Sequence, residues 1–318
     1  MSESVLTHAR YGKDFIRVFR VVRGSEFHHI VEYNVSVMLE GDIESSYTVA
    51  DNSVVVATDS MKNITYYLAK TSPHILSPER FALHLGTYIV SKYAHIHRAI
   101  ITIEKLRWSR IALGANDQPH PHSFIRDGDD KHTVEVEVDA SAGKDNLSAK
   151  VTSGIADLLV LKTAGSAFYG YIRDEHTTLM EVDDRILSTS VDLAYTFAPL
   201  SLSPPSDAKK LDFTIPEGFA PGSVWDADNV VARARNATLD IFALDDSASV
   251  QATLFKMGQR VIAENAGVVS VTYKLPNKHY IPVNMNYIGI DNTTPANAEV
   301  FVPTSAPSGL ISATISRK

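Results

Sequence analysis

The order in which local patterns follow one another constrains the fold of this chain more than any single motif. The first half opens with two runs of alternating apolar and polar residues, which predict strands. Two segments with apolar residues three and four positions apart then predict helices, and two more alternating runs follow. The predicted strands span 15–22, 29–42, 99–108 and 132–140, and the helices begin near Thr58 or Asp59 and at Ser77.

The second half repeats this order. Its predicted strands span 157–163, 168–174, 268–275 and 280–288, and its helices span about 223–243 and the residues after Ser249. Five of the 14 prolines fall within 199–222, which predicts a surface loop there. We therefore predict an α+β protein made of two tandem ββααββ units, residues 1–150 and 151–318.

The composition excludes several classes of function. The chain has 318 residues, a net charge of −7 and no cysteine, so disulfides, thiolate metal ligands and a cysteine nucleophile are excluded. No window is dominated by Lys or Arg, and we expect no nucleic acid partner. No apolar run approaches the roughly 20 residues that cross a bilayer, and the N-terminus lacks the apolar core of a secretory signal. We therefore expect no membrane association.

Two predicted helix starts could hold an anion or a carbonyl oxygen, because their first backbone N–H groups have no partner within the helix. They are Thr58-Asp59 and Val250-Gln251. The simpler interpretation is that polar residues here only cap the helices. Gln251 is less easily explained in this way, since glutamine is not a preferred cap and can offer both a donor and an acceptor to a flat heterocycle.

Three other side chains are candidates for binding or catalysis. Arg185 has the planar fork that suits an anion, although a surface ion pair with Asp183 or Asp184 would also explain it. Phe168 could stack on a ring, or it could simply pack in the core. Lys13 precedes the first predicted strand and could act as a base only in a suitable environment, whereas most lysines are merely solvated.

A strand over the segment LPNKHY would place Asn277 and His279 on one face and Lys278 on the other. This pair could recognise a ligand or could form an ordinary solvated edge. Histidine occurs 12 times, including the pairs His95/His97 and His120/His122. Without cysteine or a zinc-binding helix motif, we interpret these histidines as structural or surface residues and predict no metal site.

Taken in order along the chain, these motifs resemble those of the urate oxidase (uricase) family. The segment HPHSFIRD resembles the fungal and animal members more than the bacterial ones. The resemblance runs from about Tyr11 to Ile311, and LPNKHY and VATDS are its most specific parts. The motifs are YGKD (11–14), DNSVVVATDSMKN (51–63), HPHSFIRD (120–127), FYGYIRDE (168–175), DRILST (184–189), SASVQAT (247–253), LPNKHY (275–280) and NAEVF (297–301).

The resemblance implies the tunnelling fold, with antiparallel sheets, helices on one side, and a homotetramer whose active sites lie between subunits. It also implies roles for the candidate residues. Phe168 would stack on the purine, and Arg185 and Gln251 would grip its edge. The backbone N–H groups of Val250 and Asp59 would meet other ring atoms.

The remaining implied roles concern proton transfer and dioxygen. Thr58 of a neighbouring subunit would contact both urate and a catalytic water, and Lys13 would form a proton relay with it. His279 would extend that relay, and Asn277 would hold dioxygen and later water above the ring. Ile311 matches an apolar position near that pocket.

The implied reaction joins urate, dioxygen and water to give 5-hydroxyisourate and hydrogen peroxide in purine catabolism. Deprotonated urate is electron-rich, so we expect neither a metal nor an organic cofactor. The alternative is a catalytically inactive purine- or pterin-binding protein of the same fold, but such a protein would not need the relay. Cyclohydrolases with cysteine ligands are excluded by composition, and aldolases of this fold are shorter.

The resemblance also implies a peroxisomal location. The C-terminal residues Ser316-Arg317-Lys318 do not provide the targeting tripeptide S-K-L, so a cytoplasmic location is expected if that signal is truly missing.

Overall fold

The computed structural model describes residues 4–202 and 225–318. Its contacts divide the chain into two units, each made of separate segments. Unit 1 comprises Met1–Gly154, Tyr195–Val231 and Ala266–Val269, and unit 2 comprises Ile155–Ala194, Ala232–Asn265 and Ser270–Lys318. The boundary between residues 150 and 151 stays a prediction.

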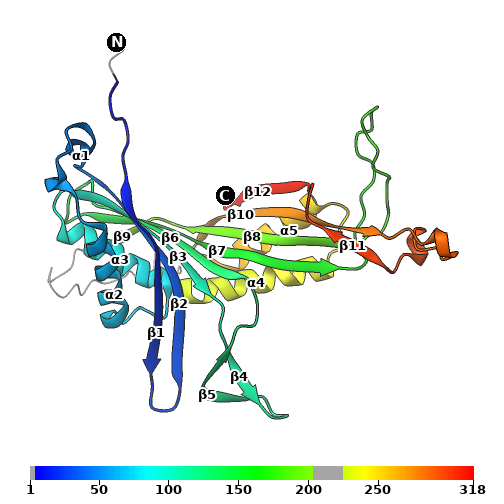
Figure 1. The fold of residues 1–318 in the computed structure, drawn as a ribbon, viewed down its shortest axis with the longest axis horizontal. Coiled ribbons are helices and arrows are strands. Elements are labelled where there is room, and N and C mark those ends of the chain that lie inside the picture. The colour runs from blue at the N-terminus through cyan, green and yellow to red at the C-terminus, as the bar shows by residue number, and fades with distance from the viewer. Residues whose placement is uncertain (1–3, 203–224) are drawn as a thin grey trace. The chain divides into compact units, whose positions relative to one another are not determined.

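In unit 1, the antiparallel strands β1, β2, β3 and β6 pair with one another in this order, and β7 follows β6 in the same sheet (Figure 1). The first four span Tyr11–Arg23, His28–Gly41, Ile96–Leu106 and Lys131–Asp139, which confirms the four strands predicted in this half. Alternate residues of β2, from Val31 to Leu39, are buried, as expected for a strand with one face on the core. The first part of β7 (Leu147–Lys162) pairs with the short strand β9 (Leu200–Leu202).

Two helices pack on this sheet. Helix α2 (Thr58–Thr71) contacts β1, and α3 (Pro78–Lys92) contacts β3 and β6. Both helices begin where the sequence predicts, and the Ser77 hydroxyl caps α3 by accepting the Arg80 N–H. Gly86 lets α3 approach the sheet closely, since a Cβ atom there would lie 2.7 Å from a Val138 methyl group.

The smaller elements of unit 1 were not predicted from the sequence. They are helix α1 (Glu44–Thr48), the 3-10 helix η1 (Asn52–Val54), and a separate hairpin of β4 (Ser109–Leu113) and β5 (Gln118–Ile125). Arg110 anchors the hairpin, because its guanidinium donates to the carbonyls of His120, Pro121 and His28.

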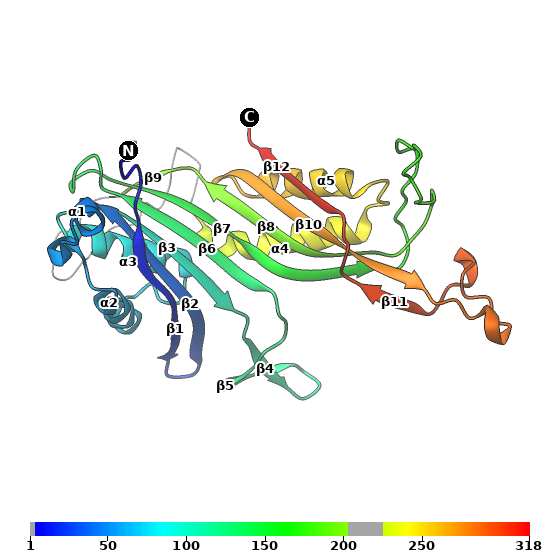
Figure 2. The same ribbon diagram turned by 45° about the horizontal axis from the view of Figure 1, so that its top comes forward.

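Unit 2 contains the second part of β7, most of β8 (Leu187–Phe197) and β10 (Val268–Pro282), and all of β11 (Phe301–Thr304) and β12 (Leu310–Ser316). Helices α4 (Ala227–Leu244) and α5 (Val250–Glu264) lie on one side of these strands (Figures 1 and 2). Gly258 of α5 repeats the arrangement of unit 1, since a Cβ atom there would lie 2.6 Å from Ile315 of β12. The principal elements again follow the predicted order ββααββ.

Two of the strands predicted for this half are wrong. Residues 168–174 form no strand, because Gly170 has a left-handed φ of 73° and Phe168 makes only an isolated bridge with Val182. The hairpin partner of β7 is β8. Residues 280–288 are not a separate strand either: β10 continues unbroken to Pro282, and residues 286–288 form the 3-10 helix η2 (Asn286–Ile288).

Two other predicted segments lie partly outside the described residues. The predicted loop 199–222 contains β9, and its remainder from residue 203 lies outside the described residues. The predicted helix 223–243 corresponds to α4, which begins at Ala227.

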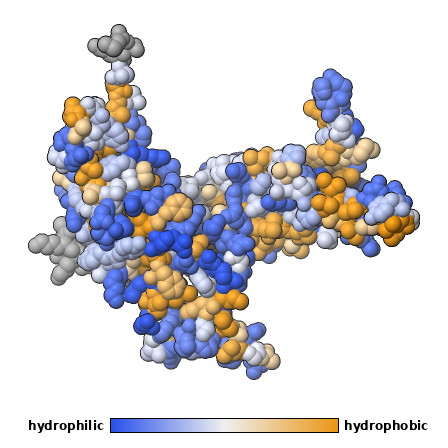
Figure 3. Space-filling view, viewed as in Figure 1, coloured by the Kyte–Doolittle hydropathy of each residue, from blue (hydrophilic) through white to orange (hydrophobic). Residues whose placement is uncertain are grey.

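An exposed apolar surface covers the segment around β11 and the residues before it, which include the 3-10 helix η3 (Pro295–Asn297). Figure 3 shows this surface toward the right-hand end of the view. Tyr287 is 81 % exposed, and Ile288, Ile290, Val300 and Val302 are about half exposed or more. Buried Asn292 holds the segment in shape by donating to the carbonyls of Val283 and Val300. A rigid apolar surface of this kind is typical of protein–protein contacts.

Candidate active site

Lys13 lies inside β1, not before the first strand as predicted, and it adjoins a one-residue β-bulge. Lys13 pairs with Val37, but Ile16 pairs with Val35, and Phe15 between them has a φ of 52°. Residues directly opposite each other in antiparallel strands point to the same face. The bulge therefore turns Lys13 to the same face as buried Ile16, which regular alternation would not allow.

The start of α2 is open to a ligand. Its N-cap residue is Ala57, which makes no side-chain cap, so Thr58 is not a capping residue. Ser60 and Met61 donate to the Ala57 carbonyl, whereas the N–H groups of Thr58 and Asp59 have no partner within the helix. These two N–H groups can bind an acceptor atom or an anion.

Contacts in unit 1 bring Lys13 and this helix start together. The Val56 N–H donates to the Tyr11 hydroxyl over 2.7 Å, which ties β1 to the residues just before α2. A hydrogen bond from Lys62 lowers the pKa of Asp59, and the charge of Lys13 lowers it further. The charge of Lys13 therefore acts on the start of α2, and its pairing with Thr58 stays a prediction.

In unit 2, an irregular arm of residues 163–186 carries Phe168 and Arg185. The backbones of Phe168 and Val182 exchange two hydrogen bonds, of 2.8 and 3.0 Å. The Asp184 carboxylate accepts the N–H of Gly165 over 2.7 Å and so fixes the arm. Among the described residues, neither Asp183 nor Asp184 forms an ion pair with Arg185. The ion-pair interpretation of Arg185 therefore has no support in the described part of the chain.

Arg185 and Phe168 form a cation–aromatic pair. The Arg185 Cζ lies 5.1 Å from the centroid of the Phe168 ring. Arg185 is half-buried, its Nε has no hydrogen-bond partner among the described residues, and burial lowers the pKa of its guanidinium. A half-buried cation with a free donor beside an aromatic ring can hold a planar anion.

The arm also lies beside the start of α5. Ala167 donates to the Ser247 carbonyl over 2.8 Å, and Ser247 donates to the Gly165 carbonyl over 3.0 Å. Two residues later, the Ser249 hydroxyl caps α5 by accepting the Ala252 N–H. Gln251 is thus not a cap; it is exposed in the first turn, next to buried Val250. The arm and the helix start together present an arginine, an aromatic ring and open N–H groups.

Asn277 and His279 occupy a break in the pairing of β10. Strand β12 pairs with β10 up to Pro276, and β11 pairs with it from His279 onward. The Asn277 N–H donates to Gly309, but its buried side-chain Oδ1 has no partner among the described residues. Because the strand is continuous here, Asn277 and His279 share a face, as predicted. Lys278 is half-buried, more covered than the solvated position expected for it.

The structure thus gathers the predicted residues into groups. Lys13, Thr58 and Asp59 belong to unit 1. Phe168, Arg185, Val250 and Gln251 belong to unit 2, as do Asn277 and His279 on β10. Within residues 4–202 and 225–318, no group of three His, Cys, Asp or Glu side chains could hold a metal ion. None of the helices described is long and apolar enough to cross a membrane.

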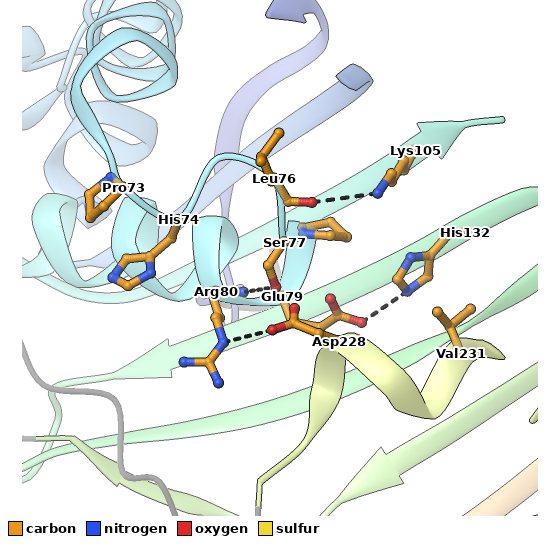
Figure 4. Close-up of a pocket in the computed structure, with 11 residues that line it drawn as sticks. Pro73, His74, Leu76, Ser77, Glu79, Arg80, Lys105, His132, Asp228 and Val231 are labelled. Atoms are coloured by element: carbon orange, nitrogen blue, oxygen red, sulfur yellow. Dashed lines mark hydrogen bonds and ion pairs between the residues drawn. The ribbon is translucent and has the colours of Figure 1, made fainter. Parts of the chain in front are cut away.

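A separate polar pocket of about 340 Å³ lies in unit 1 and is lined by none of the predicted site residues (Figure 4). Fully buried Glu79 accepts a hydrogen bond from His132 Nε2 over 2.9 Å, and the other carboxylate oxygen has no partner among the described residues. Burial lowers the pKa of Lys105, which shares the pocket, although the charge of Glu79 opposes this change.

Replacing His132 by alanine is expected to lower the free energy of unfolding by about 3 kcal/mol, since it leaves a buried carboxylate without its partner. Chemical denaturation would measure this. The control is His176→Ala, whose pair with Glu175 is exposed on both sides and should contribute nothing measurable. Equal effects of the two substitutions would contradict a special role for the buried pair.

Comparison with known proteins connects this geometry to one family. A sequence model of the family described as Uricase matches residues 9–137 and 151–312. The uricase of Aspergillus flavus is 44 % identical over 319 residues, covering 99 % of this chain and 97 % of the relative. The uricase of Schizosaccharomyces pombe is 38 % identical and covers both chains fully.

Solved structures agree with the sequence comparisons. The crystal structure of uricase from Arthrobacter globiformis superposes with a TM-score of 0.82 at 32 % identity, covering 100 % of this chain and 96 % of the other. This likeness confirms the predicted α+β tunnelling fold, and the sequence matches confirm the predicted resemblance, fungal relatives included. The chain belongs to the uricase family.

Proposed function

We propose that this chain is a urate oxidase that needs no metal or organic cofactor. It would convert urate, dioxygen and water into 5-hydroxyisourate and hydrogen peroxide. Urate gives up two electrons and dioxygen takes them, so the reaction balances without another oxidant. The observation that carries this proposal is the half-buried Arg185 guanidinium beside Phe168 at the open start of α5. That arrangement suits a flat anion, and the relatives named uricase give no support to an inactive binding protein.

Each residue would have a distinct task. Phe168 would stack on the purine, while Arg185 and Gln251 would hold its edge and the N–H groups of Val250 and Asp59 would meet its heteroatoms. Lys13 and Thr58 would take a proton from urate and later return one, with His279 extending the path. Asn277 would hold dioxygen and then water, and the water could donate to its Oδ1, which lacks a partner among the described residues. Fixed groups of this kind accelerate a reaction by positioning its reactants.

The proposal includes a homotetramer, two tandem units 1–150 and 151–318, a role in purine catabolism and a peroxisomal location. The tetramer has support in exposed apolar surface. Strand β1 pairs only with β2 among the described strands and exposes Phe15 and Phe19, and the segment around β11 exposes further apolar residues. Unpaired strand edges with apolar side chains are ready docking sites. Site groups divided over two units are compatible with active sites shared between subunits.

The test is direct. Purified protein is mixed with urate in aerated buffer with a chelator, and urate absorbance and hydrogen peroxide are followed. We expect urate to disappear with one equivalent of peroxide formed. Binding of urate without turnover would favour the inactive alternative. Neither binding nor turnover by a protein of tetrameric mass would overturn the proposal.

A further inference from the structure

The aromatic ring of Phe168 belongs to a stack of side chains. The ring of Tyr171 stacks on it with centroids 4.7 Å apart and planes inclined by 16°, which is a favourable offset geometry. The Arg173 guanidinium in turn lies 5.6 Å from the centroid of the Tyr171 ring. Arg173, Tyr171 and Phe168 thus form successive layers, and the Arg185 guanidinium adjoins the Phe168 ring as well.

Hydrogen bonds fix the middle layer. The Tyr171 hydroxyl donates to the Leu179 carbonyl over 2.7 Å. Arg173 Nη1 donates to that same carbonyl over 2.7 Å and to the Tyr171 hydroxyl over 3.1 Å. Both ends of the Tyr171 side chain are therefore held, one by its backbone and the other by two hydrogen bonds of its hydroxyl.

The backbone of the arm makes this stack possible. Gly170 has a φ of 73°, which a residue with a side chain adopts only with strain, and its N–H donates to Glu181 over 2.7 Å. This turn brings Phe168 and Tyr171 to the same side of the arm, while Tyr169 between them is 63 % exposed. The conformation of Gly170 therefore allows the rings of Phe168 and Tyr171 to stack.

We propose that Tyr171 is a positioning residue for urate: it supports the face of the Phe168 ring that urate does not use. This inference rests on the proposed function, because it assumes that Phe168 stacks on the substrate. A ring fixed before the substrate arrives loses less freedom on binding. Tyr171 itself touches no reacting atom, and Arg173 acts only by holding Tyr171.

Such support predicts a particular kinetic effect. Stacking on Phe168 stabilises bound urate and the transition state alike, so its loss raises KM and changes kcat little. Replacing Tyr171 by leucine is expected to raise the KM for urate, and the Kd for a purine that cannot be oxidised, by roughly three- to tenfold. Tyr171→Phe keeps the ring but loses the hydroxyl contacts that hold it, so its KM should rise clearly less than that of Tyr171→Leu.

The experiment compares steady-state kinetics and binding of xanthine in Tyr171→Leu, Tyr171→Phe and the control Tyr169→Leu, an exposed neighbour outside the stack. Each variant is first checked for thermal unfolding and native mass. A fall in KM for Tyr171→Leu would mean that Tyr171 competes with urate for Phe168, which overturns the proposal. Equal KM increases in Tyr171→Leu and Tyr171→Phe would also overturn it, since the second variant keeps the ring.

Arg173→Met provides a second test that does not depend on the folding of Tyr171→Leu. It should raise KM in the wild-type background about as much as Tyr171→Phe does, and it should have a smaller effect in Tyr171→Phe, which lacks the hydroxyl that Arg173 holds. Additive effects would show that Arg173 acts independently of Tyr171, against the proposal. The proposed function fails separately, if the wild-type protein consumes no urate or if Phe168→Leu leaves KM unchanged.

Discussion

Replacing Lys13 by methionine is expected to lower kcat for urate oxidation by roughly 10²- to 10⁴-fold, the range usual for removal of a group that transfers a proton. Methionine keeps the length of the side chain and removes only the amine. Thr58→Ala should have an effect of the same order, because Lys13 and Thr58 would act as one relay, and the double variant should be little worse than either alone. Stopped-flow absorbance of urate would measure the rates.

The control for Lys13→Met is Lys70→Met, an exposed lysine in the last turn of α2. It carries the same change of charge and should leave kcat unaltered. Xanthine should still bind to Lys13→Met with a Kd close to that of the wild type. Near-normal turnover in both Lys13→Met and Thr58→Ala would remove the relay from the mechanism.

Loss of the Arg185 guanidinium is the second large effect that we expect. Arg185→Gln should raise the KM for urate by about 30-fold or more, since truncating one side of a desolvated charge pair commonly has an effect of this size. Arg185→Lys keeps the charge but loses the planar fork, so it should recover only part of the affinity. Isothermal titration with xanthine would separate binding from turnover.

Arg260→Gln is the matched control, because Arg260 makes surface ion pairs with Asp240 and Glu264 and none of the predicted site residues. It should leave KM unchanged. A KM for Arg185→Gln within twofold of the wild-type value would show that this guanidinium does not hold the anion, and the proposed site would then need another cation.

The sequence was sufficient to predict the elements with strong periodicity and clear ends. Ser77 as N-cap and Pro78 as first helical residue predict the start of α3, and the alternation in β2 predicts a half-buried strand. Groups within one motif were also predictable: Asn277 and His279 share a face because a strand alternates. The relation of Lys13 to the start of α2 came only from resemblance, since the residues lie far apart in sequence.

The errors have physical causes. The segment FYGYIRD is apolar enough for a strand, but Gly170 takes a left-handed conformation that ends any ladder. The predicted strands 268–275 and 280–288 were separated at Pro276, yet the Pro276 carbonyl accepts the Thr189 hydroxyl and the strand continues to Pro282. The bulge beside Lys13 depends on pairing with β2, which local sequence patterns do not reveal.

The break in the pairing of β10 at Asn277 links the thermal stability of the protein to the occupancy of its site. In the described chain the buried Oδ1 of this residue is an acceptor that no protein group satisfies, a deficit that costs free energy as long as it persists. A small molecule that donates a hydrogen bond to this oxygen removes the cost, and the free energy gained contributes to the affinity of that molecule for the site. The protein should therefore unfold at a higher temperature when a molecule that donates to the Asn277 side chain is bound.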